Sequence, residues 1–345
     1  MKDHSTQSRK QQHVELCVNE SVTFRSKTSG FEHYEFIHNA LPECDFSDVS
    51  TETDFLGVCC MMPLLISCMT GGYPDAERIN RELAEVCETL RIPMGVGSQR
   101  QAIENSAFHR SFQVVRESAP SIPILSNIGA SEIAKMKSVV GILQIIDLIK
   151  ADALVIHLNP LQELLQPEGS PNFRGVLHGI ERLVQVLEIP IIVKEVGAGI
   201  SGEVASRLLS VGVSGIDVAG AGGTSWAGVE ILRNEEQESL SKFWDWGIPT
   251  VDCIRQIVPL KSTHNFTLIS SGGIHSAMEI AISIALGADF CGSARPMLAA
   301  LLAGGQKELS ELLNTLQLDL RRVLFLVGAV KVSELQNIEL VRKTY

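Results

Sequence analysis

The sequence predicts a (β/α)8 barrel, or TIM barrel, preceded by an N-terminal extension. From residue 63 onward, short apolar runs alternate with longer amphipathic stretches, and there are eight such runs. Polar or glycine-rich residues follow nearly every run. Eight strand and helix units with polar residues at one end of the strands are typical of this barrel. Periodicity does not show whether the sheet closes, so a doubly wound open sheet is the alternative.

The eight apolar runs are predicted to be parallel strands. Their apolar residues are continuous rather than alternating, which is expected for strands that are covered on both faces. In chain order the runs are residues 63–69, 93–97, 123–129, 153–159, 190–196, 215–220, 267–273 and 289–294.

Amphipathic helices are predicted between the strands, for example over residues 75–90, 202–212 and 276–287. The last two end at a glycine, the residue most common just after a helix. Residues 225–255 contain all three tryptophans, Trp226, Trp244 and Trp246, and are predicted to form a long loop before the seventh strand. Loops of this length in a barrel often act as lids.

The chain is expected to be a single domain, with an extension over residues 1–62 packed on a barrel over residues 63–345. The net charge of −11 and the lack of a basic block exclude the electrostatic footprint of a nucleic-acid binder. The polar start is not a secretory signal, and the longest apolar run, residues 58–69, is too short to span a bilayer. We therefore expect a cytoplasmic protein with no membrane segment. Eight cysteines without a CxxC pair indicate free thiols rather than a zinc site.

Two glycine-rich segments are candidates for phosphate binding. Gly272 and Gly273 follow the seventh strand and precede a helix, so backbone N–H groups and the positive end of the helix dipole would face a ligand there. The alternative is a turn that merely requires glycine. The segment DVAGAGGTSW, residues 217–226, offers a similar nest of N–H groups with the hydroxyl of Thr224. Two such segments on one barrel favour phosphate, since loops after the last strands commonly bind it.

Lys194 ends the fifth predicted strand, where a cation at the barrel mouth would suit an anionic cofactor. The alternative is a salt bridge with Glu195, but successive side chains of a strand point to opposite sides. Other strand ends carry polar groups that would each be ordinary loop residues on their own, namely Ser98, Gln99, Arg100 and Asn127.

The segment HLNPLQE, residues 157–163, places four polar side chains at the end of the fourth predicted strand. Glu163 is a candidate Mg²⁺ ligand, because Mg²⁺ is typically held by one or two carboxylates together with substrate phosphates and water. His157 and Asn159 share strand parity and, as neutral groups, can donate hydrogen bonds to phosphate oxygens. The alternative is that His157 is a core histidine with its hydrogen bonds made inside the protein and that Glu163 is exposed to solvent. Four polar groups within seven residues favour a site.

These segments together resemble the type 2 isopentenyl-diphosphate isomerase family, over almost the whole chain and in order. The resemblance implies an FMN-dependent TIM barrel that interconverts isopentenyl and dimethylallyl diphosphate by a 1,3-proton shift. It further implies a requirement for reduced FMN and Mg²⁺, reduction of the flavin by NADPH, and assembly into a homo-oligomer, a tetramer or octamer. The motifs are SRK (8–10), HNALPE (38–43), MTGG (69–72), GVGSQR (95–100), NIGA (127–130), HLNPLQE with QPEG (166–169), VKEVGAGIS (193–201), AGGTSWAGVE (221–230) and SSGGI (270–274).

The resemblance also implies roles for individual residues. FMN contacts are expected from Ser67, Cys68, Met69, Thr70, Ser98, Asn127, Lys194, Thr224, Gly272, Gly273, Ile274, Ala294 and Arg295. Substrate contacts are expected from Arg9, Lys10, Ser98, Gln99, Arg100, His157, Asn159 and Gln162, and Mg²⁺ binding from Glu163. No side chain is assigned as the proton donor, because reduced FMN fills that role, with Gln162 in support. The chain departs from the family at Ser170, where Asp is common, and at His275, where Arg is common.

Three other functions are weighed against this interpretation. The 2-hydroxy-acid oxidases use a histidine in a late glycine-rich loop, and AGAGGTSW contains none. Inosine-monophosphate dehydrogenase needs a reactive cysteine on a mobile loop, but Cys253 lies in TVDCIRQIV, which is predicted to be helical. A non-enzymatic flavin or phosphate-binding module would leave HLNPLQE unexplained.

Overall fold

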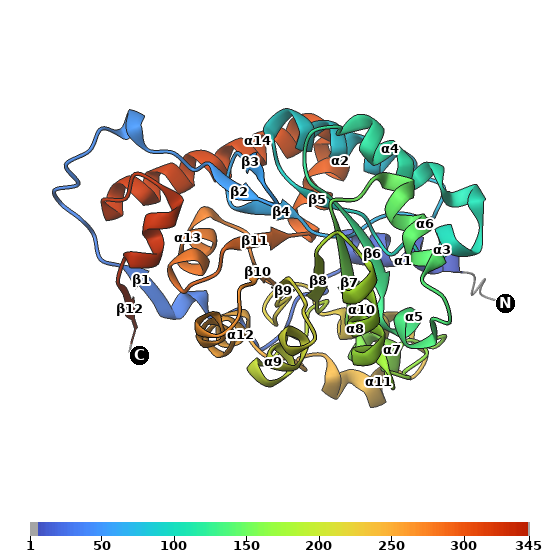
Figure 1. Ribbon diagram of the computed structural model, residues 1–345. Helices are drawn as coiled ribbons and strands as arrows, with labels where there is room; N and C mark the ends of the chain where they lie inside the picture. Colours follow the sequence, from blue (N-terminus) through green and yellow to red (C-terminus); the bar gives the residue numbers. More distant parts are fainter. Residues whose placement is uncertain (1–5, 344–345) are drawn as a thin grey trace.

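The computed structural model describes residues 6–343 and shows a closed barrel of eight parallel strands with helices around it (Figure 1). The ring closes where Cys291 pairs with Leu64. Each strand lies within one of the eight predicted runs, so the barrel is confirmed and the open sheet is wrong. The strands are β4 (Leu64–Ile66), β5 (Met94–Gly95), β6 (Ile124–Gly129), β7 (Ala153–His157), β8 (Ile191–Lys194), β9 (Gly215–Asp217), β10 (Thr267–Ser271) and β11 (Phe290–Ser293).

Alternate residues of the strands fill the interior of the barrel, which explains why the runs are apolar throughout. Leu65, Leu125, Val155 and Ile192 belong to one buried cluster, whereas the residues between them pack on the outer helices in a second cluster. The hairpin β2 (Thr53–Phe55) and β3 (Val58–Cys60) adds Phe55 to the inner cluster, with its ring centroid 4.6 Å from that of Phe290. The hairpin therefore closes the N-terminal end of the barrel, and a ligand must enter at the other end.

The helices predicted over residues 75–90, 202–212 and 276–287 are confirmed. The last is stabilised by a capping box between Ser276 and Glu279. The helices are α1 (Thr6–Asn19), α2 (Ala76–Leu90), α3 (Arg100–Glu104), α4 (Arg110–Ser118), α5 (Ala130–Lys135), α6 (Val140–Ile149), α7 (Pro160–Leu165), α8 (Val176–Val186), α9 (Gly202–Ser210), α10 (Trp226–Arg233), α11 (Gln237–Leu240), α12 (Thr250–Ile257), α13 (Ala277–Ala285) and α14 (Arg295–Val327). Short 3₁₀ helices span Phe31–His33, Phe46–Asp48, Ser106–Phe108, Ser241–Phe243, Val258–Ser262 and Val332–Asn337.

The predicted loop over residues 225–255 is wrong, because most of it is helical. The Ser225 side chain accepts the N–H of Gly228 at 3.0 Å and so caps α10. Trp244 is buried against Gly228, where an added Cβ would lie 2.7 Å from the indole ring. These contacts hold the segment on the barrel, so its length does not indicate a lid.

Residues 6–62 lie on both ends of the barrel. Helix α1 crosses the open end, and β1 (Tyr34–Phe36) pairs antiparallel with β12 (Leu340–Arg342) near the C-terminus (Figure 1). Residues 1–5 of the predicted extension lie outside the described residues. All eight cysteines are described and all are free. None of the helices described over residues 6–343 is long and apolar enough to cross a membrane.

Candidate active site

A cavity of about 270 Å³ opens at the C-terminal end of the barrel, roofed by α1. The strand parity that places Leu65, Leu125, Val155 and Ile192 inside the barrel also turns inward the side chain two positions later on each strand. These inward side chains, which form the cavity floor, are Ser67, Asn127, His157 and Lys194.

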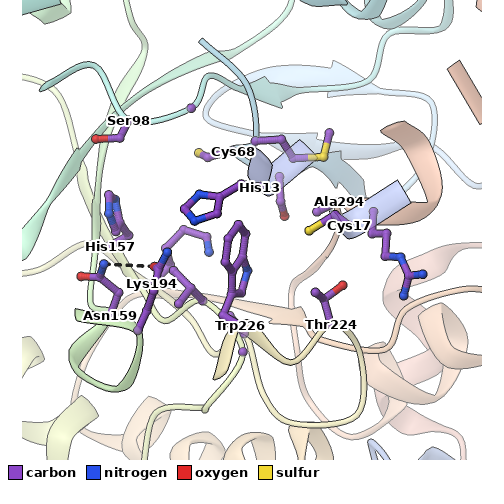
Figure 2. A pocket seen from close by; sticks show the side chains of 18 of the residues that line it. His13, Cys17, Cys68, Ser98, His157, Asn159, Lys194, Thr224, Trp226 and Ala294 are labelled. Carbon is purple, nitrogen blue, oxygen red and sulfur yellow. Dashed lines mark hydrogen bonds between the residues drawn. The ribbon is translucent and has the colours of Figure 1, made fainter. Parts of the chain in front are cut away.

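Most of the predicted site residues line this one cavity. In Figure 2, His157, Asn159 and Lys194 lie on one side, Thr224 and Ala294 on the other, and His13 and Trp226 between them. The predicted residues that line the cavity are Arg9, Lys10, Ser67, Cys68, Met69, Ser98, Arg100, Asn127, His157, Asn159, Gln162, Glu163, Lys194, Thr224, Gly272, Gly273, Ile274, Ala294 and Arg295.

Gln99 and Thr70, also predicted to contact a ligand, are not among the residues that line the cavity, and their side chains are hydrogen-bonded within the protein. The Gln99 amide donates to the carbonyl of Ile145 at 3.0 Å and accepts from the hydroxyl of Ser126 at 2.6 Å. It also accepts the N–H of Asn127 at 3.2 Å, so it braces the strand that carries Asn127. The Thr70 hydroxyl donates to the side-chain carbonyl of Asn80. Both side chains are buried in the wall, with their polar atoms used by the protein.

The glycine-rich loops pack so closely that side chains would not fit. Gly272 has φ +100°, and a Cβ there would lie 2.1 Å from the carbonyl oxygen of Gly220. A Cβ on Gly222 would lie 2.1 Å from the backbone nitrogen of Ser29. Turn geometry and loop packing therefore both require glycine. The same loops line the cavity through Gly220, Gly223, Gly272 and Gly273, where their backbone is open to a phosphate.

We expect Gly272→Ala to lose FMN because the new Cβ forces the two loops apart. Gly57→Ala is the matched control, since Gly57 also has a positive φ, +79°, but has no atom within 4 Å of an added Cβ. Both variants strain the backbone by about 1 kcal/mol, whereas only the first also deforms the cavity. Fluorescence titration with FMN measures the difference. Equal FMN affinity of the two variants would contradict the role of this loop.

Lys194 faces the cavity and Glu195 does not, as the alternation of side chains predicts. The Lys194 ammonium donates to the carbonyl of Glu195 at 2.5 Å, and the two side chains form no salt bridge. The Glu195 carboxylate instead accepts the N–H groups of the next three residues, 196–198, at 2.5 to 2.7 Å. Glu195 thus holds the loop after β8 in place. The ammonium of Lys194 is not neutralised by Glu195 and faces the cavity.

Cationic side chains gather where α1 meets the ends of β4 and β5. Lys10 donates to the carbonyl of Gly71 at 2.6 Å and to that of Ser98 at 2.8 Å, which fastens α1 to the barrel. Burial, with a further contribution from neighbouring Arg9, lowers the pKa of Lys10 to about 7. Arg100 lies nearby and is held by Glu104 at 2.8 Å. An anion such as a diphosphate would relieve the repulsion among these cations.

The HLNPLQE segment forms the end of β7 and the start of α7. The Asn159 amide donates to Gln162 at 3.1 Å and to Glu163 at 3.2 Å, which orients both side chains. The other Glu163 oxygen accepts the backbone N–H of Ser170 at 2.7 Å. This contact uses the main chain, so the departure at Ser170 does not disturb it.

The same residues fit a Mg²⁺ ion that is also bound by phosphate. The side-chain carbonyl oxygen of Asn159 is buried without a hydrogen-bond partner beside the Glu163 carboxylate. Among residues 6–343, no three His, Cys, Asp or Glu side chains gather closely enough to hold a metal by themselves. A metal ion here would therefore need oxygens from substrate and water, as Mg²⁺ commonly does.

His157 is a neutral imidazole in this environment. Burial, aided by the charges of Lys194 and Lys10, lowers the pKa of His157 to about 3. Its Nδ1 lies 2.9 Å from the side-chain carbonyl oxygen of Asn127, which orients the ring. A Cβ on Gly129 would approach the ring to 3.2 Å, so glycine leaves room for it.

The prediction from sequence missed a buried carboxylate, Glu230, at the side of the cavity. It lies 2.8 Å from Nε2 of His13 and accepts from Gln162 at 3.0 Å and from Arg233 at 2.5 Å. Burial opposes its ionisation, but His13 and Arg233 outweigh burial and lower the pKa of Glu230. Trp226 lies on the same helix and its ring meets that of His13 edge-on, with centroids 5.1 Å apart. Had residues 226–233 been predicted as a helix, Trp226 and Glu230, which are four residues apart, would have been expected on one face of it.

Comparison with known proteins identifies the family. The FMN-dependent dehydrogenase family matches residues 3–121 and 164–342. An isopentenyl-diphosphate delta-isomerase from Chlorobaculum parvum is 47% identical over 351 aligned positions, covering 98% of each protein. A protein of the same name from Nostoc sp. is 43% identical and covers 96% of this chain and 95% of its own length. The chain belongs to the FMN-dependent, type 2 isopentenyl-diphosphate isomerase family. The resemblance seen in the motifs is confirmed.

Solved structures with low sequence identity share the fold of this isomerase family member. A lactate oxidase from Pediococcus acidilactici superimposes with a TM-score of 0.71 at 16% identity, covering 98% of this chain and 94% of its own. A mandelate oxidase gives 0.68 at 18% identity, covering 97% and 95%. The match to FMN-dependent dehydrogenases leaves out residues 122–163, which include the HLNPLQE segment. The alignment with the Chlorobaculum parvum isomerase, in contrast, covers 98% of this chain.

Proposed function

We propose that this chain interconverts isopentenyl diphosphate and dimethylallyl diphosphate with reduced FMN and Mg²⁺. One observation carries the proposal: a single cavity joins glycine-rich phosphate loops to a separate cationic wall that contains a candidate Mg²⁺ ligand. Two walls that each suit phosphate fit a cofactor and a substrate that both carry phosphate groups. Relatives named isopentenyl-diphosphate delta-isomerase match the chain over nearly its full length.

FMN fits the part of the cavity between the late loops and the strand ends. The loops carrying Thr224, Gly272 and Gly273 would bind its phosphate, and Lys194 would place a positive charge beside the ring system. The hydroxyl of Ser67 is buried without a partner and is available to the same ligand. Reduced FMN would supply the proton exchange of a 1,3-proton shift, which few side chains can perform on an unactivated alkene.

The remaining polar residues would bind and orient the diphosphate substrate. Arg9, Lys10 and Arg100 supply positive charge, and Glu163 would hold Mg²⁺ against the phosphate oxygens. Gln162 is fixed at both ends of its amide, by Asn159 at 3.1 Å and by Glu230 at 3.0 Å. An amide held in this way can orient the substrate without gaining or losing a proton.

NADPH as the reductant of FMN, a homo-oligomeric assembly of four or eight chains and a cytoplasmic location complete the proposal. Their support is the family resemblance in the motifs. The alternative based on a reactive cysteine finds no support, because Cys253 is buried in α12 and burial raises the pKa of its thiol to about 12.

An anaerobic assay tests the proposal directly. Purified protein with FMN, NADPH and Mg²⁺ is expected to convert isopentenyl diphosphate to dimethylallyl diphosphate, followed by NMR of the products. A parallel sample with 2-hydroxy acids tests the oxidase alternative. If the protein binds FMN in its reduced form but does not isomerise the substrate, the proposal is contradicted. The remaining interpretation would then be a flavin-binding module without this activity.

The low pKa of Lys10 predicts a pH effect on substrate binding. At pH 6 the ammonium is charged in the empty site, whereas above its pKa of about 7 it is neutral and must take up a proton to pair with a diphosphate. The KM should therefore rise between pH 7 and 8.5, by up to about tenfold per pH unit. Lys10→Arg, which stays charged, is expected to flatten this rise. The same pH profile in both proteins would contradict the assignment.

A further inference from the structure

Asp217 is a buried carboxylate inside the barrel that the proposed reaction does not use. It is the last residue of β9 and is 3% exposed. The preceding Ile216 belongs to the outer cluster, so strand alternation turns Asp217 inward. Its partner on β10 is Ile269, a member of the inner cluster. Asp217 therefore lies in the barrel interior, just beneath the cavity floor.

Two hydrogen bonds fix the Asp217 carboxylate there. One oxygen accepts the hydroxyl of Ser271 at 2.5 Å and the backbone N–H of Ala219 at 3.3 Å. Both donor residues line the cavity, although Asp217 itself does not. Two donors on one oxygen favour the ionised form, because a carboxylate accepts hydrogen bonds more strongly than a carboxylic acid.

Lys194 is the positive charge that faces Asp217. The two residues are paired in register on adjacent strands, and both side chains point inward. Adjacent strands lie about 4.8 Å apart, so the charges interact within the low-dielectric interior. No direct ion pair joins the two side chains in the described part of the chain, and the ammonium donates to the Glu195 carbonyl instead. Burial raises the pKa of Asp217, and the charge of Lys194 acts against that rise.

We propose that Asp217 is the counter-charge of Lys194 and thereby sets how strongly the site prefers reduced FMN over oxidised FMN. The inference rests on the proposed function, because it takes Lys194 to lie beside the flavin. A lysine alone stabilises the negative charge that reduction brings to the ring, and a carboxylate behind it weakens that field. Asp217 is thus a positioning residue for the field of Lys194, with no contact to cofactor or substrate.

The test is the midpoint potential of bound FMN in Asp217→Asn. Asparagine keeps the size of the side chain and an oxygen for Ser271 and Ala219, and it removes the negative charge. We expect the preference for reduced FMN to increase at least tenfold, which corresponds to about +30 mV for a two-electron couple. The matched control is Asp289→Asn, because Asp289 pairs with Lys261 at 2.6 Å at the opposite end of the barrel. The midpoint potential of FMN bound to Asp289→Asn should equal that of the wild type.

A second variant keeps the test decisive if Asp217→Asn does not fold. Ser271→Ala removes a hydrogen bond that favours the ionised carboxylate, so the pKa of Asp217 should rise and the potential should move in the same, positive direction as in Asp217→Asn. A purely structural role of Asp217 would weaken both forms of FMN equally and leave the potential unchanged, which would overturn the inference. So would a negative shift in Asp217→Asn. Wild-type protein that binds no FMN would overturn the proposed function as well, whereas bound FMN with equal potentials overturns this inference alone.

Discussion

Glu163→Gln is expected to remove most of the Mg²⁺-dependent isomerase activity while FMN stays bound. The substitution keeps the size of the side chain and can still accept the N–H of Ser170, now at 2.7 Å from the carboxylate. It removes the one negative charge of the HLNPLQE segment, and a neutral amide is a much weaker ligand for Mg²⁺. We expect the Mg²⁺ concentration for half-maximal activity to rise at least about tenfold, with a lower rate at saturation.

The measurement is isomerase activity as a function of Mg²⁺, with the flavin spectrum recorded on the same samples. Glu132→Gln is the matched control, since Glu132 is another carboxylate that lines the cavity but lies beside Arg100. Its Mg²⁺ dependence should match that of the wild type. Unchanged turnover of Glu163→Gln at limiting Mg²⁺ would exclude a metal-binding role for this residue.

Lys194→Ala is expected to weaken the binding of reduced FMN more than that of oxidised FMN. Lys194 is 8% exposed and lines the cavity, and its ammonium donates to the carbonyl of Glu195, which leaves further N–H groups for a ligand. A hydrogen bond to a charged group contributes about 1.5–3 kcal/mol, which corresponds to roughly a 10- to 150-fold loss of affinity. The midpoint potential of bound FMN should accordingly become more negative.

Lys261→Ala serves as the control for Lys194→Ala. Lys261, like Lys194, donates to a main-chain carbonyl, at 2.8 Å, but it pairs in addition with a carboxylate at 2.6 Å and lies at the N-terminal end of the barrel. Removing it should lower stability without altering the flavin. If Lys194→Ala retained both the affinity and the potential of the wild type, Lys194 would have no electrostatic role toward FMN.

Local patterns were sufficient for the barrel but not for the segment before the seventh strand. The eight strands appear as uninterrupted apolar runs because every strand residue is buried, either in the interior or under a helix. Residues 225–255 lack such a run and were therefore predicted to be a long loop before the seventh strand. Helix α10 nevertheless forms, since Ser225 caps it and Trp244 packs on Gly228. Both stabilising contacts were present in the sequence, as a serine cap and a small residue, but only the packing gives them their effect.

In the candidate site, too, local patterns predicted some residues and packing decided others. Gln99 stands between Ser98 and Arg100 in the motif GVGSQR, yet only its neighbours line the cavity. A strand ends just before this segment, so alternation no longer predicts where each side chain points. The side chain of Gln99 turns away from the cavity because its hydrogen-bond partners, Ile145 and Ser126, lie in the barrel wall. Glu230 was missed for a related reason, because the helix that carries it was predicted as loop.

The sequence by itself determined the barrel, the end at which ligands bind and the family, because strand burial and motif order are local properties of the chain. Only the tertiary structure decided which polar groups meet. Lys10 is fastened to Gly71 and Ser98, 61 and 88 residues away, and Gln162 to Glu230, 68 residues away. Such contacts depend on how distant segments pack around a common cavity, and no periodicity along the chain encodes that packing.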